Sequence, residues 1–238
     1  MKETELNSLK TSLKNENPEM RADTILALNC SLYDQKDPKE YYREYHQAIP
    51  ILTEALADSD NYVRIVAAEK LVAIDRTFQE ANAFHVVKTL IEIIASQDET
   101  VVYEDENDID IGCLTVLECA YYTLGDIIFL VDNTVAEIVQ LFANRDPEYR
   151  KAVTCALSQI IYGNAPVWIQ ALESDNKLIR LGVIYMLGDL YDYGDLYDDM
   201  EAVVPALNKL SEDQDRQVSK AASKLLKFLK RMDVIENY

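Results

Sequence analysis

The chain has 238 residues, of which 23 are basic and 42 acidic, so its formal net charge is −19. A surface this acidic repels nucleic acid and anionic membranes and favours cationic partners. Gly and Pro are scarce at six each, and no apolar run approaches the roughly 20 residues that cross a membrane, so we expect a soluble, mainly helical cytoplasmic protein.

In chain order, the first predicted element is a helical hairpin at 3–14 and 20–32, and the second is a more regular hairpin at 47–74. In the second hairpin, apolar residues recur at spacings of three and four in both halves, which is typical of helices with one buried face. Asp60 suits the N-cap of its second helix, because the carboxylate can accept hydrogen bonds from free amides of the first turn. One hairpin cannot bury both apolar faces, so we expect further copies beside it.

Arg64, in YVRIVAAEKL, is an anchor that aligns the other copies. The equivalent positions are Arg21, Asp110, Arg150, Arg180 and Ser219, with Asn17, Asp146 and Asp215 as N-caps of three copies. Apolar helices at 84–96, 135–143, 166–173 and 202–210 precede the later copies. Six hairpins leave no stretch for a separate domain, so the predicted fold class is all-α and residues 1–238 form one repeat domain.

The helix, the Asp-containing turn and the pattern V-R-x-x-A-A-x-x-L resemble the HEAT repeat family, in particular the short HEAT-like repeats of phycobilisome lyases. The resemblance covers nearly the whole chain. It implies a right-handed α-solenoid of about six antiparallel helix pairs, with the second helices lining a concave face. It also implies a structural ladder between neighbouring turns, formed by Asp60, Arg64, Asp146, Arg150 and Arg180. It does not select a function, because this fold serves scaffolds, adaptors, lyases and DNA-repair enzymes alike.

Two acidic segments depart from the repeat, and we predict that they bind a partner. The first is the long turn 97–108 of the third copy, which contributes Glu104, Asp105, Glu106, Asp108 and then Asp110 in place of the anchor arginine. A calcium loop is disfavoured there, because no frame supplies both the Gly and the Glu that an EF-hand loop needs. A solvated acidic loop that meets a basic partner is the favoured interpretation.

The second acidic segment is 188–201, GDLYDYGDLYDDME, where carboxylates alternate with tyrosines. Its predicted partner-binding residues are Asp189, Tyr191, Asp192, Tyr193, Asp195, Tyr197, Asp198 and Asp199. Such a surface can receive Lys and Arg through ion pairs and cation–π contacts. The alternative is a plain exposed turn, in which Asp and Gly are also favoured.

Charge is unevenly distributed along the chain. Residues 97–201 hold 5 basic and 21 acidic side chains, a net charge of −16, which exceeds what solubility alone requires. The last helix is basic instead. Its cationic residues recur at helical spacing: Lys220, Lys224, Lys227 and Arg231. We interpret that basic stripe as the solvated outer face of a capping helix, opposite its apolar side.

Nothing in the sequence indicates catalysis or a bound cofactor. A phosphate-binding glycine loop is absent, and the four cysteines, Cys30, Cys113, Cys119 and Cys155, lack metal-ligand spacing and suit buried, reduced thiols. Trp168 lies on an apolar stripe and is predicted to belong to the core. We therefore expect a non-enzymatic protein without metal or cofactor.

Three functional classes remain open. The favoured one is a monomeric scaffold or adaptor whose concave acidic face binds a basic protein or peptide, with no nucleic acid or membrane partner. The second is an immunity-type inhibitor whose acidic surface covers the cationic site of a nuclease toxin. The third, suggested only by the repeat subtype, is a lyase-like chromophore-handling protein.

Overall fold

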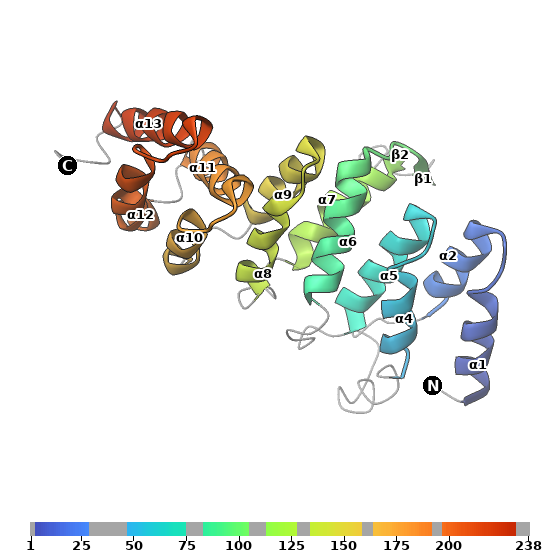
Figure 1. The fold of residues 1–238 in the computed structure, drawn as a ribbon. Helices are drawn as coiled ribbons and strands as arrows, with labels where there is room; N and C mark the ends of the chain where they lie inside the picture. The colour runs from blue at the N-terminus through green and yellow to red at the C-terminus, as the bar shows by residue number, and fades with distance from the viewer. Residues whose placement is uncertain are drawn as a thin grey trace. The chain divides into compact units, whose positions relative to one another are not determined.

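The computed structural model describes residues 3–28, 47–74, 83–104, 113–127, 134–158, 164–191 and 197–231. These residues form twelve α-helices, a short 3-10 helix and a two-stranded antiparallel ribbon. Figure 1 shows the helices following one another as pairs, which confirms the predicted all-α helical-repeat fold. The chain divides into two compact units, Met1–Val131 and Asp132–Tyr238. No helix in the described ranges combines the length and hydropathy that crossing a membrane requires.

The described residues of the first unit form three helix pairs. Its helices are α1 (Glu3–Ser12), α2 (Pro18–Leu26), α4 (Ile49–Ala55), α5 (Asn61–Ile74), α6 (Ala83–Ser96) and α7 (Val116–Ile127). The second helices α2, α5 and α7 contact one another in that order, and each packs against the first helix of its own pair. Ile25, Leu52, Leu71 and Leu90 are fully buried between them, so the apolar core runs through all three pairs.

The second unit repeats this plan, with three further pairs among its described residues. Its helices are α8 (Val135–Gln140), continued by the 3-10 helix η4 (Leu141–Ala143), α9 (Pro147–Ser158), α10 (Ala165–Leu172), α11 (Lys177–Tyr191), α12 (Tyr197–Leu210) and α13 (Arg216–Arg231). The second helix α11 packs against both α9 and α13, while α10 packs against α12. Trp168 of α10 is fully buried, as predicted.

The turn before a second helix is built by two side chains. The N-cap residues are Asn17, Asp60, Asp146, Asn176 and Asp215, and each accepts a hydrogen bond of 2.9–3.0 Å from the amide two residues later. The residue two positions before each cap accepts from the cap's own amide, at 2.7–3.2 Å. These bonds satisfy amides that the helix itself leaves free. The predicted caps Asn17, Asp60, Asp146 and Asp215 are thus confirmed.

The anchor residue is the fourth residue of the second helix, and its side chain folds back onto the turn. Nη1 of Arg21, Arg150 and Arg180 donates to the carbonyl oxygen six residues earlier, at 2.8, 2.8 and 2.6 Å. In the last pair, the Ser219 hydroxyl donates to the carbonyl of Ser211 at 2.7 Å. The anchor therefore closes its own turn from inside the repeat.

Some anchors also reach a carboxylate of the next pair, but the acids of this ladder differ from those predicted. Arg21 binds both oxygens of Asp58, at 2.8 and 2.7 Å, and Nε of Arg180 lies 3.1 Å from Asp213. Asp60 and Asp146, predicted as ladder members, are N-caps instead, because their oxygens are taken by amides of their own helices.

Arg64 and Arg150 complete the ladder differently. Arg64 pairs with Glu92 of α6 and donates to Asn61, whose amide in turn donates to Asp98 at 2.9 Å. The turn that follows Arg150 has Ser174 at the position where the turns that follow Arg21 and Arg180 have Asp58 and Asp213. Within the described residues, Arg150 consequently forms no ion pair.

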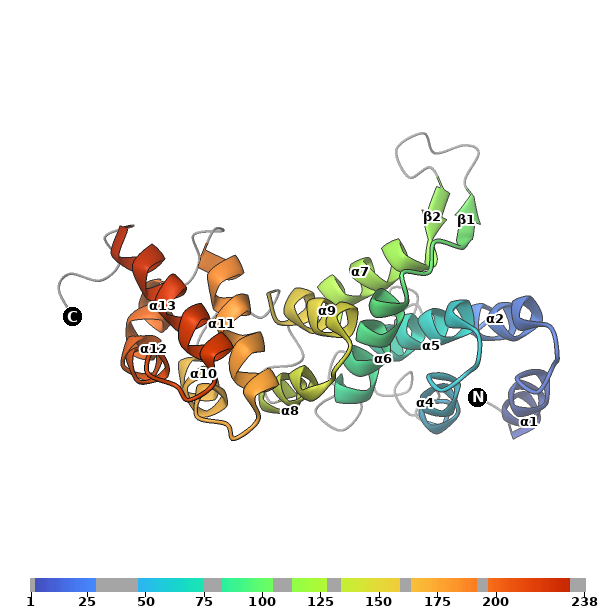
Figure 2. The ribbon, with the colours of Figure 1, turned by 45° about the horizontal axis from the view of Figure 1, so that its top comes forward.

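The third pair departs from the repeat through an inserted ribbon. Strands β1 (Val101–Glu104) and β2 (Cys113–Thr115) pair antiparallel between α6 and α7, with Val101 opposite Thr115, and project from the start of α7 (Figure 2). The alignment of Asp110 with the anchor arginines is therefore wrong, because α7 begins only at Val116. Cys119, the fourth residue of α7, occupies the anchor position.

The described thiols lie in protected but not fully buried positions. Cys119 and Cys155 are both unpaired thiols and half-buried. Burial, with smaller contributions from Glu69 and Glu118, raises the pKa of Cys119 from 9.0 to about 11, and burial also raises the pKa of Cys155. Because the thiolate is the reactive form, both side chains suit the unreactive, reduced role that we expected.

The Arg21–Asp58 pair gives the first unit a measurable pH dependence. Burial opposes ionisation of Asp58, but hydrogen bonds from Arg21 and from the amide of Asp60 outweigh it, so its pKa lies below 3.8. Asp58→Asn keeps an oxygen for the Asp60 amide and removes the charge, so we expect the free energy of unfolding to fall by about 1–2 kcal/mol at pH 7. Urea unfolding followed by circular dichroism measures this loss.

The stabilisation by a carboxylate with a lowered pKa is present above its unfolded-state pKa and disappears as the pH falls through its folded-state value. The difference between the wild type and the variant should therefore narrow below about pH 4. Asp23→Asn, at an exposed position on α2, is the charge-matched control and should show no such narrowing. Equal unfolding free energies for the wild type and Asp58→Asn at pH 7 would contradict the assignment.

Candidate functional site

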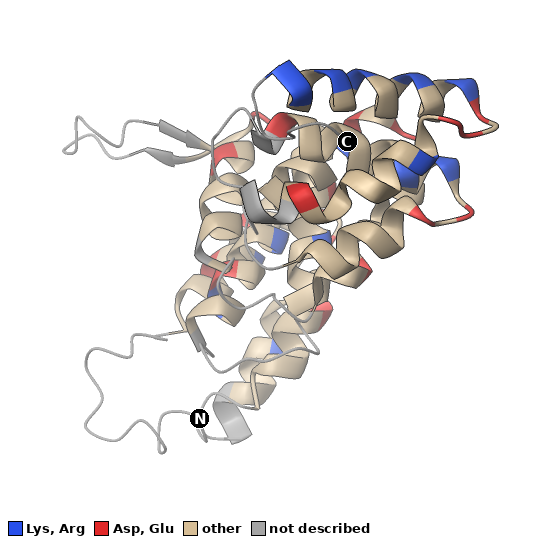
Figure 3. Ribbon diagram, turned by 90° about the vertical axis from the view of Figure 1, so that its left-hand side faces the viewer, with Lys and Arg blue, Asp and Glu red and all other residues tan. Residues whose placement is uncertain are grey.

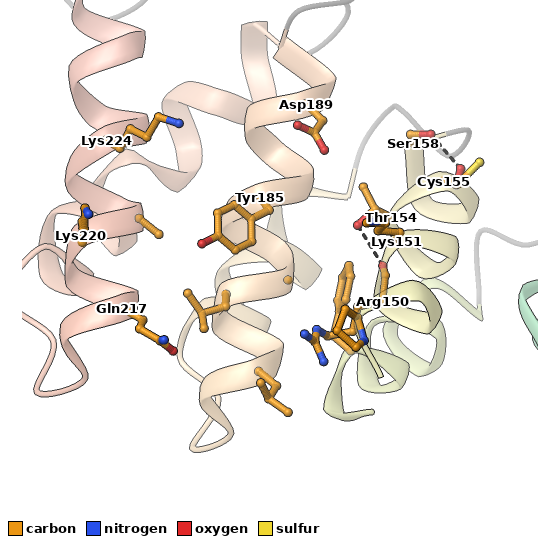
Figure 4. A pocket seen from close by; sticks show the side chains of 16 residues that line it. Arg150, Lys151, Thr154, Cys155, Ser158, Tyr185, Asp189, Gln217, Lys220 and Lys224 are labelled. Carbon is orange, nitrogen blue, oxygen red and sulfur yellow. Dashed lines mark hydrogen bonds between the residues drawn. The ribbon is translucent and has the colours of Figure 1, made fainter. Parts of the chain in front are cut away.

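The second unit contains a groove of about 1060 Å³ on the side formed by α9, α11 and α13. Each helix contributes one face, since its lining residues recur at spacings of three and four. The lining residues include Arg150, Lys151, Thr154, Cys155 and Ser158 from α9, Leu178, Leu181, Gly182, Tyr185 and Asp189 from α11, and Gln217, Lys220, Ala221 and Lys224 from α13. In Figure 4, Tyr185 lies between the α9 and α13 walls.

The floor of the groove depends on a close approach between α11 and the 3-10 helix η4. Phe142 of η4 is fully buried and lines the groove together with Gly182 of α11. A Cβ atom at position 182 would overlap the Phe142 ring. Glycine therefore lets the ring lie directly against the α11 backbone, which sets the depth of the groove.

The groove is basic, although the chain as a whole is strongly acidic. Its walls carry four cationic side chains, Arg150, Lys151, Lys220 and Lys224, and one carboxylate, Asp189. Lys151 pairs with Glu148 on its own helix at 2.7 Å. Among the residues that the structure describes, the other three cations form no ion pair. The expectation of an acidic concave face does not hold for this groove.

The basic stripe of α13 accordingly has a different role from the one predicted. Figure 3 shows Lys and Arg recurring along this helix. All four basic residues are exposed, as predicted, but Lys220 and Lys224 also line the groove. Lys227 and Arg231 are exposed and do not line it. The sequence identified the polar side of α13 but not which flank of it faces α11.

Two further groove residues were not selected as binding residues from the sequence. Arg150 was assigned only to the ladder, and Tyr185 was not distinguished from its apolar neighbours. Tyr185 is 58% exposed on a helix whose flanking residues Ile184 and Met186 are buried. An aromatic residue out of phase with the buried face of α11 was the available signal for it.

The structure places few of the predicted partner-binding residues. Of these residues, Asp189 is exposed on α11 and lines the groove. Glu104 ends β1 and Tyr191 ends α11, while Tyr197, Asp198 and Asp199 open α12. The remaining predicted residues lie outside the described residues: Asp105, Glu106, Asp108, Asp110, Asp192, Tyr193 and Asp195.

The segment 188–201 is less of a turn than we predicted. Helix α11 continues through Gly188 to Tyr191, and α12 begins at Tyr197 rather than at Ala202. Met200, Val203 and Leu207 are fully buried at helical spacing, which explains why α12 starts early. Only residues 192–196 lie between the two helices.

Comparison with solved structures supports the fold. The chain is similar, at 15% identity and a TM-score of 0.50, to a chain of the solved complex of Kap95p with RanGDP, over 94% of this chain and 30% of that one. It is also similar to an engineered protein (18% identity, TM-score 0.39, covering 97% and 98% of the two chains) and to a designed armadillo repeat protein (14%, 0.35, 94% and 99%). No family model and no curated protein matches the sequence. A helical-repeat fold of the HEAT and armadillo kind is thus supported, whereas the resemblance to phycobilisome lyases stays a prediction.

Gly182→Ala tests the close approach at the floor of the groove. We expect it to lower the free energy of unfolding by about 1–3 kcal/mol, because the buried Phe142 ring has to move. Gly125→Ala in α7 is the matched control, since a Cβ there meets nothing within 4 Å and should stabilise the helix by up to about 1 kcal/mol. Thermal unfolding measures both. A Gly182→Ala variant as stable as the wild type would refute the proposed role of this glycine.

Proposed function

We propose that the chain is a non-catalytic protein-binding repeat protein whose acidic segments bind a basic segment of a protein partner. Helix pairs stacked in this way present long, regular surfaces, which suit extended partners. Kap95p, in the similar solved complex, binds RanGDP, which supports a protein partner here.

The supporting observation is the concentration of acids in residues 97–201, of which only some stabilise the described fold. Of the 21 acids in residues 97–201, several stabilise the fold. Asp98 accepts from Asn61 and Thr100 at 2.9 and 3.1 Å, and Glu118 accepts from the amide of Thr115 at 2.8 Å. Asp146 is an N-cap, and Glu148 and Glu173 pair with lysines. Among the other acids, those of 104–110 and 188–201 form the two clusters, and we take these clusters as the candidates for binding.

The positions of these two segments favour contact with a partner. Residues 105–112 connect β1 to β2, and the strands lead away from the α6–α7 pair (Figure 2). Residues 192–196 connect α11 to α12, with Asp189 exposed one turn earlier. The acidic residues of both segments therefore lie at, or next to, the ends of described helices and strands.

The test uses a synthetic peptide of alternating Lys and Arg as the probe. Replacing Asp192, Asp195 and Asp198 with Asn removes three negative charges from the 188–201 segment. We expect affinity to fall about tenfold, since exposed charge contacts contribute roughly 0.5 kcal/mol each. Helix content should not change. Fluorescence anisotropy at low and high salt measures the binding, which should weaken as salt screens the charges.

The control variant carries Glu137→Gln, Glu148→Gln and Asp175→Asn, which removes the same charge from exposed positions on the second unit. This variant should bind the peptide within about twofold of the wild type. Equal losses in both variants would mean that only net charge matters. An unchanged affinity in the first variant would remove 188–201 from the site and leave 104–110 as the segment to mutate.

A further inference from the structure

We propose that the groove between α9, α11 and α13 binds an acidic peptide segment of a protein partner. This site is separate from the acidic segments and has the opposite charge preference. Its ligand would be a short extended segment with carboxylates near both ends and an apolar or aromatic side chain between them. The proposal rests on charge, on the arrangement of the walls and on the exposed ring at the centre.

The charges of the groove are available to a ligand. Elsewhere in the second unit, three described cations are paired: Lys177 with Asp215 at 3.0 Å, Lys209 with Glu173 at 3.3 Å and Arg180 with Asp213. Arg150, Lys220 and Lys224 form no ion pair with any described residue, although they belong to a chain of net charge −19. Three uncompensated cations around one concavity provide charge complementarity for an anionic ligand.

The cations come from opposite walls, which sets the spacing of the ligand's charges. Arg150 lies on α9, and Lys220 and Lys224 lie on α13, with α11 between them (Figure 4). Adjacent packed helices are separated by about 8–10 Å, so the two walls are on the order of 20 Å apart. An extended chain spans that distance in about six residues. Carboxylates five or six residues apart can therefore reach both walls.

The centre of the groove favours a peptide over a polyanion. Tyr185 is 58% exposed there, and the half-buried Leu178 also lines the groove. An aromatic or aliphatic side chain between the two charged ends can pack on this surface. A nucleic acid would instead place continuous negative charge along the groove and next to Asp189, whereas the peptide carries its carboxylates only near its two ends.

The test titrates the full-length chain with a fluorescent, end-capped peptide of seven residues. The peptide has two Glu at each end and a central Phe, flanked by Gly and Ser. Lys220→Gln with Lys224→Gln should weaken binding about tenfold, because two charge contacts are lost. Neither lysine has a hydrogen-bond or ion-pair partner among the described residues, so the fold should be unaffected, and circular dichroism would verify this.

The matched control is Lys227→Gln with Arg231→Gln, which removes the same charge from the same helix at exposed positions outside the groove. This control should bind within about twofold of the wild type. Equal losses in the two double variants would overturn the proposal in favour of unspecific attraction to α13. Absence of peptide binding would also overturn it. Tighter binding of a 12-base-pair DNA duplex than of the peptide would reassign the groove to nucleic acid.

Tyr185→Ala distinguishes a binding site with a specific aromatic contact from a surface that attracts the peptide by charge alone. The variant should bind the peptide with the central Phe about fivefold to tenfold more weakly than the wild type does. Its affinity for a peptide with Ser in that position should be unchanged, since only Phe packs on the tyrosine ring. Equal effects on both peptides would exclude the aromatic contact. None of these variants should alter binding of the Lys/Arg peptide, so this proposal and the proposed function can fail independently.

Discussion

The structure depends on the hydrogen-bonded turn that precedes a second helix. One side chain caps the helix, a second orients the cap, and the anchor residue bonds back to the turn's carbonyls. Asn17, Asp60, Asp146, Asn176 and Asp215 all cap in the same way, although Asn and Asp differ in charge. What the repeat requires at the cap is an oxygen acceptor. The carboxylates that match anchor arginines, Asp58 and Asp213, lie two residues before a cap.

This distinction explains what the sequence could and could not predict about the fold. The caps and the apolar spacing could be recognised because both depend only on residues close together in the sequence. The helix pairs were therefore predicted well. The ladder was assigned to the wrong acids, since Asp58 and Asp60 lie two residues apart and only the fold shows which one faces Arg21. The ribbon was missed although Val101 and Tyr103 have the β propensity of a strand, because the acidic residues after them indicated a loop.

The candidate site was harder to predict, for a geometric reason. An amphipathic pattern tells which side of α13 is buried but not which part of its polar side lies next to another helix. Lys220 and Lys227 therefore looked equivalent in the sequence, whereas only Lys220 lines the groove. The net charge of the chain likewise did not predict the sign of the charge on this local surface. A chain of −19 attracts cations at a distance, yet its local surfaces can have either sign once pairing is taken into account.

Ser174 has a consequence for the cooperativity of the second unit. A serine at this position, where the turns after Arg21 and Arg180 have a carboxylate, leaves the junction between the α8–α9 and α10–α11 pairs without the ion pair that joins α11 to the next turn. In a stack stabilised by nearest-neighbour contacts, such a junction is the place where local opening costs least. A bound carboxylate at Arg150 would supply the missing coupling. Occupancy of the groove and cooperative unfolding of this unit would then be thermodynamically linked.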